Sequence, residues 1–512
     1  MTQTGAALIA RTLAKNGVDT CFANPGTTEM HMLAALGQEP GIDLQLCLFE
    51  GVATGAADGY ARMKGKPAAV LLHLGPGLAN GMANLHNARK ADTPVINLVG
   101  EHATYHLAHD APLTADIQGM AATVSASVAT PESPDQAGTA TADLLMAIGN
   151  GGVATLVVPN DVAWGETSAP APEAAKAPVP GFASQHVEKA VGALCSEGGA
   201  LIIGAPLITR RMANLAQAIG EATGCMVLTE PAVARMERGG GTASLNRLPF
   251  HVDPAAAALK GVTSVVLAGA REPVAFFAYP ERPSRLLPDG TQVIPLCVQG
   301  GATEASLEAL AGALGVEPAI GSGTLLPDFE ADSPIDAEVL GRVVADRLPE
   351  QAIVVDESIT NGGHLFPLCG QGPAHDWINN RGGSIGYSMP VAVGAATACP
   401  DRKVLCITGD GSAFYTLQAL WTMARYKQDV TVLVLANRTY RILANESAKI
   451  GAGAPTNNTM PLMSLENPAP DWCKLAEGQG VAAQAVNTAG QLCEALKAAF
   501  DTKGPKLIEV RM

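Results

Sequence analysis

The 512 residues carry 48 acidic and 33 basic side chains, giving a formal net charge of −15 and a pI near 5.1. This acidic balance argues against nucleic acid and anionic membranes as partners. Hydrophobic residues make up 47% of the chain, enough for about three domains. No apolar run reaches transmembrane length, and the ten scattered cysteines form no C-x-x-C pair. We therefore expect a soluble cytoplasmic protein with reduced thiols.

The first third begins with a predicted strand over 18–22 and a turn over 24–29, in which Thr27 or Thr28 can cap a helix starting near Met30. An apolar run then ends at Glu50, and small residues over 51–62 predict a helix that packs closely on a neighbour. A carboxylate at the end of a buried run is costly unless it is paired or its pKa is raised. Glu50 is thus either a functional acid or half of a structural salt bridge.

His73 follows a predicted strand over 69–72, at the start of a glycine-rich segment, 75–77, interpreted as a loop. A histidine at a strand end is usually structural, but it can also serve as an acid or base. The strand over 94–100 leads into a polar stretch, 101–110, that contains three histidines. We expect this stretch to line a pocket, with no chemistry assigned to it.

An Ala/Pro-rich segment, 168–184, and a Gly/Pro-rich segment, 317–335, have the composition of interdomain linkers. Between them, alternating strands and helices predict a second α/β unit. The domains are predicted at 1–167, 185–316 and 336–512. In the last of these, a strand over 352–355 precedes a hydroxyl-bearing loop, 356–361. The fold class is α/β, with three doubly wound domains built on parallel sheets.

The stretch 404–440 organises the rest of the chain. Two apolar runs of strand length, 404–407 and 430–435, flank a Gly-Asp-Gly turn and an amphipathic segment, 413–426, interpreted as a helix. Asp410 and Asn437 then lie at the carboxyl ends of parallel strands, where ligands of such sheets gather. A carboxylate, an amide oxygen and a backbone carbonyl suit Mg²⁺ held together with a diphosphate.

Asp410 and Asn437, together with the Glu50 segment ending in A-D-G-Y-A-R, resemble the motifs of thiamine diphosphate-dependent 2-oxo acid decarboxylases and acetolactate synthases. The resemblance implies thiamine diphosphate and Mg²⁺ as cofactors, with Asp410, Asn437 and the main-chain carbonyl of Thr439 as metal ligands. Glu50 would bind the aminopyrimidine and help to form the reactive ylid. One departure is Ala436, where the family usually has a second asparagine.

The same resemblance assigns further residues. The N-P-G-T loop places Thr27 against the substrate, and His73 resembles a proton-relaying histidine of benzoylformate decarboxylase. Ile385 would be the apolar wedge under the cofactor. The other implied cofactor-binding residues are Thr360, Gly383, Gly409, Gly411, Ser412 and Tyr440.

The implied substrate is a 2-oxo acid that loses CO₂ through an enamine, in the manner of benzoylformate decarboxylase. The alternative is carboligation of the acetolactate synthase type, and a third possibility is a non-catalytic paralogue. The central domain shows no nucleotide motif, and Phe276 and Phe277 stand where the decarboxylase supplies a second histidine. Because the family's site forms between two subunits, at least a homodimer is implied, and a homotetramer is expected.

Overall fold

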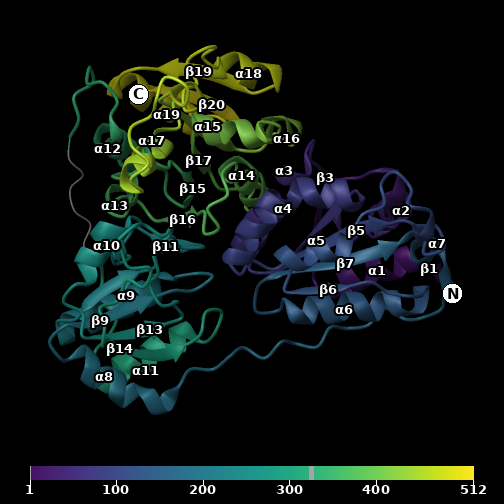
Figure 1. Cartoon of the computed structure of the whole chain (residues 1–512), viewed down its shortest axis with the longest axis horizontal. Coiled ribbons are helices and arrows are strands. Elements are labelled where there is room, and N and C mark those ends of the chain that lie inside the picture. The colour runs from purple at the N-terminus through teal and green to yellow at the C-terminus, as the bar shows by residue number, and fades with distance from the viewer. Residues whose placement is uncertain (1, 322–327) are drawn as a thin grey trace.

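Three largely parallel sheets, each covered by helices, organise the chain in the computed structural model, which describes residues 2–321 and 328–512 (Figure 1). We call the parts built on these sheets the first, central and third lobes. The predicted α/β class with three sheets is confirmed. The predicted linker 317–335 includes residues 322–327, which lie outside the described residues. Within the described part of the chain, no helix is long and apolar enough to cross a membrane.

The first lobe holds a six-stranded sheet in the order β3-β2-β4-β5-β7-β6, with every neighbouring pair parallel. A short antiparallel pair, β1 and β8, joins the two ends of this lobe. The strands are β1 Gln3–Thr4, β2 Thr20–Asn24, β3 Asp43–Leu46, β4 Ala68–Leu72, β5 Val95–Glu101, β6 Ser127–Ala129, β7 Val153–Pro159 and β8 Glu166–Thr167. The helices are α1 Gly5–Lys15, α2 Met30–Gln38, α3 Glu50–Lys64, α4 Leu74–Lys90, α5 Ile117–Val124, α6 Ala137–Ala147 and α7 Asn160–Trp164, with 3₁₀ turns η1 Thr27–Glu29, η2 Leu107–His109 and η3 Pro134–Gln136.

The central lobe follows the predicted Ala/Pro-rich linker, which crosses from the first lobe without regular structure (Figure 1). Its five-stranded parallel sheet has the order β12-β10-β9-β13-β14. The strands are β9 Gly199–Ile203, β10 Met226–Thr229, β12 Asn246–Arg247, β13 Ser264–Ala268 and β14 Gln292–Cys297. The helices are α8 Val187–Leu194, α9 Arg210–Thr223, α10 Val252–Leu259 and α11 Thr303–Leu314, with a 3₁₀ turn η4 Ser184–His186.

The third lobe holds a seven-stranded sheet, β11-β16-β15-β17-β18-β20-β19. Its edge strand β11, Met236–Arg238, comes from the central segment and pairs antiparallel with β16, so the sheet is not confined to the predicted third domain. The other strands are β15 Ala352–Glu357, β16 His375–Asn379, β17 Val404–Gly409, β18 Val430–Ala436, β19 Ala482–Val486 and β20 Lys506–Arg511. The helices are α12 Ala337–Arg347, α13 Leu365–Cys369, α14 Ser388–Ala398, α15 Asp410–Ala413, α16 Ala419–Arg425, α17 Arg441–Lys449, α18 Trp472–Gly478 and α19 Ala489–Asp501, with 3₁₀ turns η5 Phe414–Thr416 and η6 Met460–Leu462.

Two predicted segments differ from the structure. The helix expected over 413–426 is three short pieces, α15, η5 and α16, because the Thr416 hydroxyl donates to the carbonyl of Gly386 (3.0 Å) and ties the chain to another segment. The loop expected over 75–77 is the first turn of α4, where a proline costs no hydrogen bond because the first amides of a helix have no partner within it.

Helices α3 and α14 form the closest contact between the first and third lobes. A Cβ added to Gly59 would lie 2.1 Å from the carbonyl oxygen of Val391, and one added to Gly394 would lie 1.8 Å from that of Ala56. Only glycine at both positions lets the two backbones approach this closely. The predicted close packing of the small-residue helix is therefore confirmed, and its neighbour is α14.

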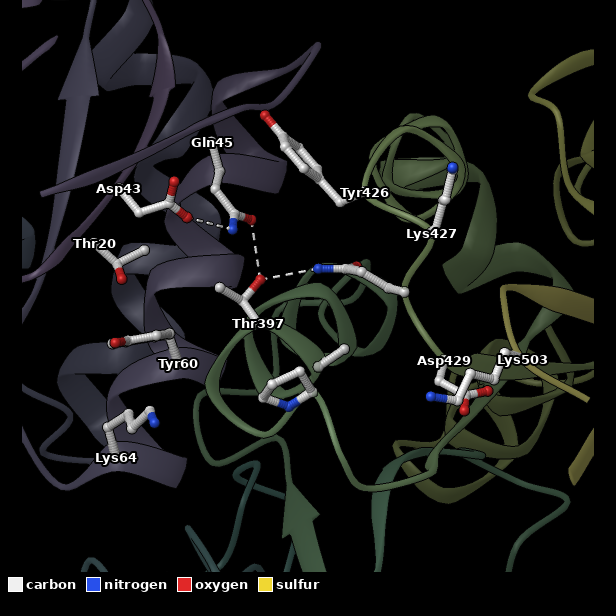
Figure 2. Close-up of a pocket in the computed structure, with 13 residues that line it drawn as sticks. Thr20, Asp43, Gln45, Tyr60, Lys64, Thr397, Tyr426, Lys427, Asp429 and Lys503 are labelled. Carbon is white, nitrogen blue, oxygen red and sulfur yellow. Dashed lines mark hydrogen bonds between the residues drawn. The ribbon is translucent and has the colours of Figure 1, made fainter.

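Beyond the carboxyl end of α3, a cavity of about 470 Å³ separates the same two lobes (Figure 2). The Thr397 hydroxyl donates to Gln45 Oε1 (3.0 Å) and accepts from Gln428 Nε2 (2.9 Å) across this gap. The bond to Gln45 holds the first lobe to the third beside α14, and the bond from Gln428, also of the third lobe, fixes the Thr397 hydroxyl. None of the predicted site residues lines the cavity.

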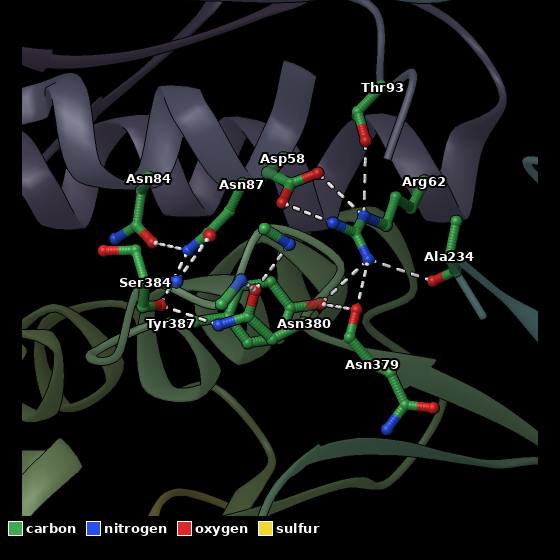
Figure 3. A network of polar contacts seen from close by, with 12 residues as sticks. Asp58, Arg62, Asn84, Asn87, Thr93, Ala234, Asn379, Asn380, Ser384 and Tyr387 are labelled. Atoms are coloured by element: carbon green, nitrogen blue, oxygen red, sulfur yellow. Dashed lines mark hydrogen bonds and ion pairs between the residues drawn. The ribbon is translucent and has the colours of Figure 1, made fainter. Parts of the chain in front are cut away.

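Arg62 joins all three lobes (Figure 3). Its guanidinium forms a bidentate pair with Asp58 (both distances 2.7 Å) and donates to the carbonyls of Ala234 (3.0 Å) and Asn379 (2.8 Å). It also donates to the hydroxyl of Tyr387 (2.9 Å). Asp58 is 0% exposed, so the ion pair is enclosed where the lobes meet.

Replacing Arg62 with alanine is expected to destabilise the protein by about 3–5 kcal/mol, since it leaves the Asp58 carboxylate buried and unpaired. Denaturant unfolding measures the change. Arg11→Ala, at an exposed arginine bonded to Gln3, is the control and should cost less than about 1 kcal/mol. Equal losses in the two variants would contradict the role of Arg62 as the link between lobes.

Candidate active site

The turn after β17 brings Asp410 and Asn437 to the same edge of the third sheet. Strands β17 and β18 are parallel neighbours, with Gly409 opposite Leu435, so the residues following each strand meet. Asp410 accepts the backbone N–H of Gly411 (2.9 Å) and that of Arg438 (2.6 Å). The second bond crosses from one turn to the other and fixes their separation. Asp410 and Asn437, the two residues predicted to supply oxygen ligands to a metal, therefore lie at one edge of the sheet, as predicted.

Asp410 is 3% exposed, and burial raises the pKa of its carboxyl group above the usual value, although the two backbone N–H groups lower it. Each of its oxygens accepts one of these N–H groups and keeps a lone pair for a cation. Asn437 Oδ1 accepts the N–H of Thr439 (3.0 Å) and likewise keeps a lone pair. Among residues 2–321 and 328–512, no cluster of three or more His, Cys, Asp or Glu side chains could hold a metal. A set of one carboxylate, one amide and one carbonyl nevertheless fits Mg²⁺.

The other residues predicted around the metal turn lie beside it. Gly409 is the last residue of β17, and Ser412 is buried in the short helix α15. Tyr440 follows the Asn437 turn, and its ring covers Gly411, where an added Cβ would lie 2.3 Å from the ring. Thr360 is half-buried beyond the carboxyl end of β15, the strand paired with β17, and so lies at the same edge of the sheet.

Gly383 and Ile385 lie in a loop, 380–387, that helix α4 of the first lobe fixes in place (Figure 3). Asn87 donates to the carbonyl of Ser384 (2.9 Å) and accepts its N–H (3.1 Å). Asn84 donates to the carbonyl of Gly386 (3.3 Å). Ile385 is half-buried between two glycines of positive φ, Gly383 and Gly386. The backbone that carries the predicted wedge is therefore held on both sides.

Glu357, a residue that the sequence did not single out, holds the far end of this loop. It is the last residue of β15, and its carboxylate accepts the N–H groups of Gly386 (3.0 Å), Tyr387 (3.1 Å) and Ser388 (2.9 Å). The Ser388 hydroxyl donates to it as well (2.8 Å). Burial raises the pKa of Glu357 to about 7, although these donors lower it. The carboxylate caps α14 and fixes the backbone beside Ile385.

Glu357→Gln should destabilise the protein more at pH 5.5 than at pH 8. The carboxyl group binds a proton more tightly in the folded protein, where its pKa is about 7, than in the unfolded chain, where its pKa is the usual 4.5. Its contribution to the stability of the folded state is therefore fully present below pH 4.5 and is lost as the pH rises through 7. Thermal denaturation of both proteins at the two pH values measures this. Glu188→Gln, at an exposed glutamate, is the control. A difference independent of pH would contradict the raised pKa.

Glu50 lies elsewhere, on the first lobe. It is the first residue of α3, where an acidic side chain favours the positive end of the helix dipole. Strand β3 already ends at Leu46, and the Glu50 side chain is half-exposed within one chain, with Asn80 donating to it (3.0 Å). The expectation of a carboxylate buried at a strand end is therefore wrong for the single chain.

His73 is fixed by a second acid that the sequence did not single out. Glu29 is buried, and its carboxylate lies 2.8 Å from His73 Nδ1. It also accepts the N–H groups of Gly26 (3.0 Å) and Leu74 (3.3 Å). Thr27, beside Glu29, is exposed in η1. Glu29 therefore joins the N-P-G-T loop to His73 at the carboxyl ends of β2 and β4, neighbouring parallel strands.

The polar stretch after β5 reaches the same edge of the first sheet. The ring centroids of His102 and His106 are 5.3 Å apart, and those of His106 and His109 are 5.8 Å apart. Burial raises the pKa of Glu101, which accepts the N–H of His102. The chemistry of this stretch stays unassigned.

Comparisons with known proteins match the two regions that carry these residues. Residues 3–121 match the N-terminal TPP binding domain of thiamine pyrophosphate enzymes, and residues 364–510 match the C-terminal TPP binding domain. The first match contains Glu50 and His73, and the second contains Asp410 and Asn437.

Full-length relatives point the same way. The chain is 47% identical to "Putative acetolactate synthase large subunit IlvX" of Mycobacterium tuberculosis, over 99% of this chain and 98% of that protein. It is 28% identical to benzoylformate decarboxylase of Pseudomonas aeruginosa, over 97% of each. Its fold superposes on the thiamine diphosphate-dependent 4-hydroxybenzoylformate decarboxylase of Rhodococcus jostii RHA1 with a TM-score of 0.82 at 26% identity, covering 100% of this chain and 99% of that one. The chain therefore belongs to the thiamine pyrophosphate enzyme family.

Proposed function

We propose that this protein uses thiamine diphosphate and Mg²⁺ to release CO₂ from a 2-oxo acid and to join the remaining acyl unit to a second carbonyl compound. The observation that carries the proposal is the pair of Asp410 and Asn437 at the ends of β17 and β18, in one cofactor domain, with Glu50 at the start of α3 in the other. Although the sequence motifs favour simple decarboxylation, the full-length relative at 47% identity supports the carboligation alternative.

The proposed site is shared between two subunits. Glu50 is half-exposed in its own chain and bonded to Asn80, while Asp410 and Asn437 bond within their own lobe. A homodimer in which the first lobe of one chain faces the third lobe of the other would bury Glu50 beside the metal turn. We propose this dimer as the minimal unit and a homotetramer as the full assembly.

The residues of this chain would divide the work as follows. Bound thiamine diphosphate supplies the carbon nucleophile that attacks the 2-oxo group and accepts the electrons left by CO₂. Asp410, Asn437 and the Thr439 carbonyl would hold Mg²⁺ and, with it, the diphosphate. Glu50 would hold and release the proton at the aminopyrimidine. Ile385 would support the cofactor from the fixed loop 380–387.

Decarboxylation alone remains a second candidate, and the His73–Glu29 pair favours it. A histidine held at Nδ1 by a buried carboxylate keeps Nε2 free for proton exchange with the substrate. Protonation of the acyl unit would release an aldehyde, the outcome expected of a decarboxylase. The likeness to benzoylformate decarboxylase over 97% of the chain also supports this candidate.

Product analysis separates the candidates. The purified protein is incubated with thiamine diphosphate, Mg²⁺ and either pyruvate or benzoylformate, and CO₂ and the organic product are both identified. Release of CO₂ with a 2-hydroxy-3-oxo acid supports carboligation, whereas CO₂ with an aldehyde supports decarboxylation. No CO₂ from any 2-oxo acid, with cofactor bound, would indicate a non-catalytic paralogue.

A further inference from the structure

Three phenylalanines of the central lobe form an exposed aromatic cluster. Phe250 precedes α10, and Phe276 and Phe277 lie in the connection between β13 and β14. The ring centroids of Phe250 and Phe276 are 4.7 Å apart, as are those of Phe276 and Phe277. These residues are 45%, 46% and 49% exposed. Neighbouring rings that stay half-exposed mark a surface suited to an apolar ligand.

The cluster lies against the candidate active site. A Cβ added to Gly383 would lie 2.6 Å from Cζ of Phe276, so this ring covers the loop that carries Ile385. On the other side, the Tyr279 hydroxyl donates to Glu446 (2.6 Å) on α17, the helix that follows Thr439 and Tyr440. The segment carrying Phe276 and Phe277 therefore spans two parts of the proposed cofactor site.

Polar contacts fix this segment in place. Glu446 accepts from Lys449 (2.9 Å) as well as from Tyr279, and Lys449 Nζ lies 2.9 Å from Nδ1 of His251, the neighbour of Phe250. Glu446, Lys449, Tyr279 and His251 are thus bonded to one another, while the three phenyl rings stay half-exposed. A group that binds there gains from burial of apolar area and from ring–ring contact rather than from hydrogen bonds.

We propose that Phe276 and Phe277, supported by Phe250, contact the side chain of the 2-oxo acid and select acids with an aromatic side chain over those with a methyl group. This inference rests on the proposed function, because it assigns the reacting acid to the same site. It concerns which acid is accepted and is independent of whether the acyl unit is then ligated or protonated.

The test is a ratio of specificity constants for CO₂ release by the holoenzyme, with benzoylformate and phenylpyruvate each compared with pyruvate. We expect the wild type to prefer an aromatic acid, and Phe276→Ala and Phe277→Ala each to lower that ratio about tenfold or more. Phe276→Leu should keep part of the preference. Val274→Ala, on the same segment and 66% exposed, is the matched control and should leave the ratio unchanged.

A binding measurement separates failure of this inference from failure of the proposed function. Phenylacetate has the ring and the carboxylate but no 2-oxo group, and calorimetry should show that it binds the holoenzyme more tightly than acetate, with the advantage lost in Phe276→Ala. That result supports the cluster even if no acid is turned over. The inference would be overturned if the wild type and the variants turned over the acids with equal ratios of specificity constants. It would also be overturned if the variants dissociated into subunits while this ratio stayed constant.

Discussion

Glu50→Gln is expected to lower turnover of a 2-oxo acid by about 10²–10⁴-fold, the range of a lost general acid–base group, without unfolding the protein. Glutamine keeps the shape of the side chain and the contact with Asn80 (3.0 Å) but cannot exchange a proton. Single-turnover CO₂ release measures the chemical step, and circular dichroism checks the fold.

The control for this prediction is Glu188→Gln, because Glu188 is also an acidic residue in the first turn of a helix, α8 of the central lobe. Any general effect of removing such a charge from a helix terminus appears there too. A Glu50→Gln protein that turns over at the wild-type rate would show that another group moves the proton.

Asp410→Ala is expected to abolish Mg²⁺-dependent retention of thiamine diphosphate. The variant removes the one charged ligand of the proposed metal site and leaves the amide of Asn437 and a backbone carbonyl. Retention is measured by gel filtration of the loaded protein followed by assay of the bound cofactor, with and without a chelator. Asp401→Ala, at an exposed aspartate of the same lobe, is the control.

A second readout needs no cofactor. Burial raises the pKa of Asp410 in the folded chain, so its contribution to stability is present below the usual pKa of 3.8 and is lost as the pH rises through the folded value. At neutral pH the ionised Asp410 therefore lowers the stability of the cofactor-free protein. Because Asp410→Asn replaces one of the two oxygens that accept a backbone N–H, each protein is compared only with itself, without and with ligands. The thermal midpoint of the wild type should rise with added Mg²⁺ and thiamine diphosphate, and that of Asp410→Asn should not. A variant still stabilised by both ligands would place the metal elsewhere.

The candidate site could be predicted only where its residues follow local patterns. Asp410 and Asn437 could be paired because each follows a buried apolar run, and parallel neighbouring strands bring such ends together. Glu50 stood out as a charge after another such run, although its burial did not follow, because the helix that begins with it leaves its side chain half-exposed.

The sequence alone determined the α/β class and the identity of the residues at the strand ends, because hydrophobic periodicity and turn residues act over a few positions. Its resemblance to thiamine diphosphate enzymes implied the two cofactor lobes. Only the tertiary structure decided what supports them: Glu29 beside His73, Glu357 under the loop of Ile385, and Phe276 against Gly383. Each of these contacts joins segments far apart in the chain, and no local period encodes which distant strand end or helix start will lie next to a given side chain. The first two contacts form within one lobe, where neighbouring parallel strands bring distant segments to the same edge of a sheet. The third joins the central and third lobes, which the hydrogen bonds of Arg62 to Ala234 and Asn379 link to the first.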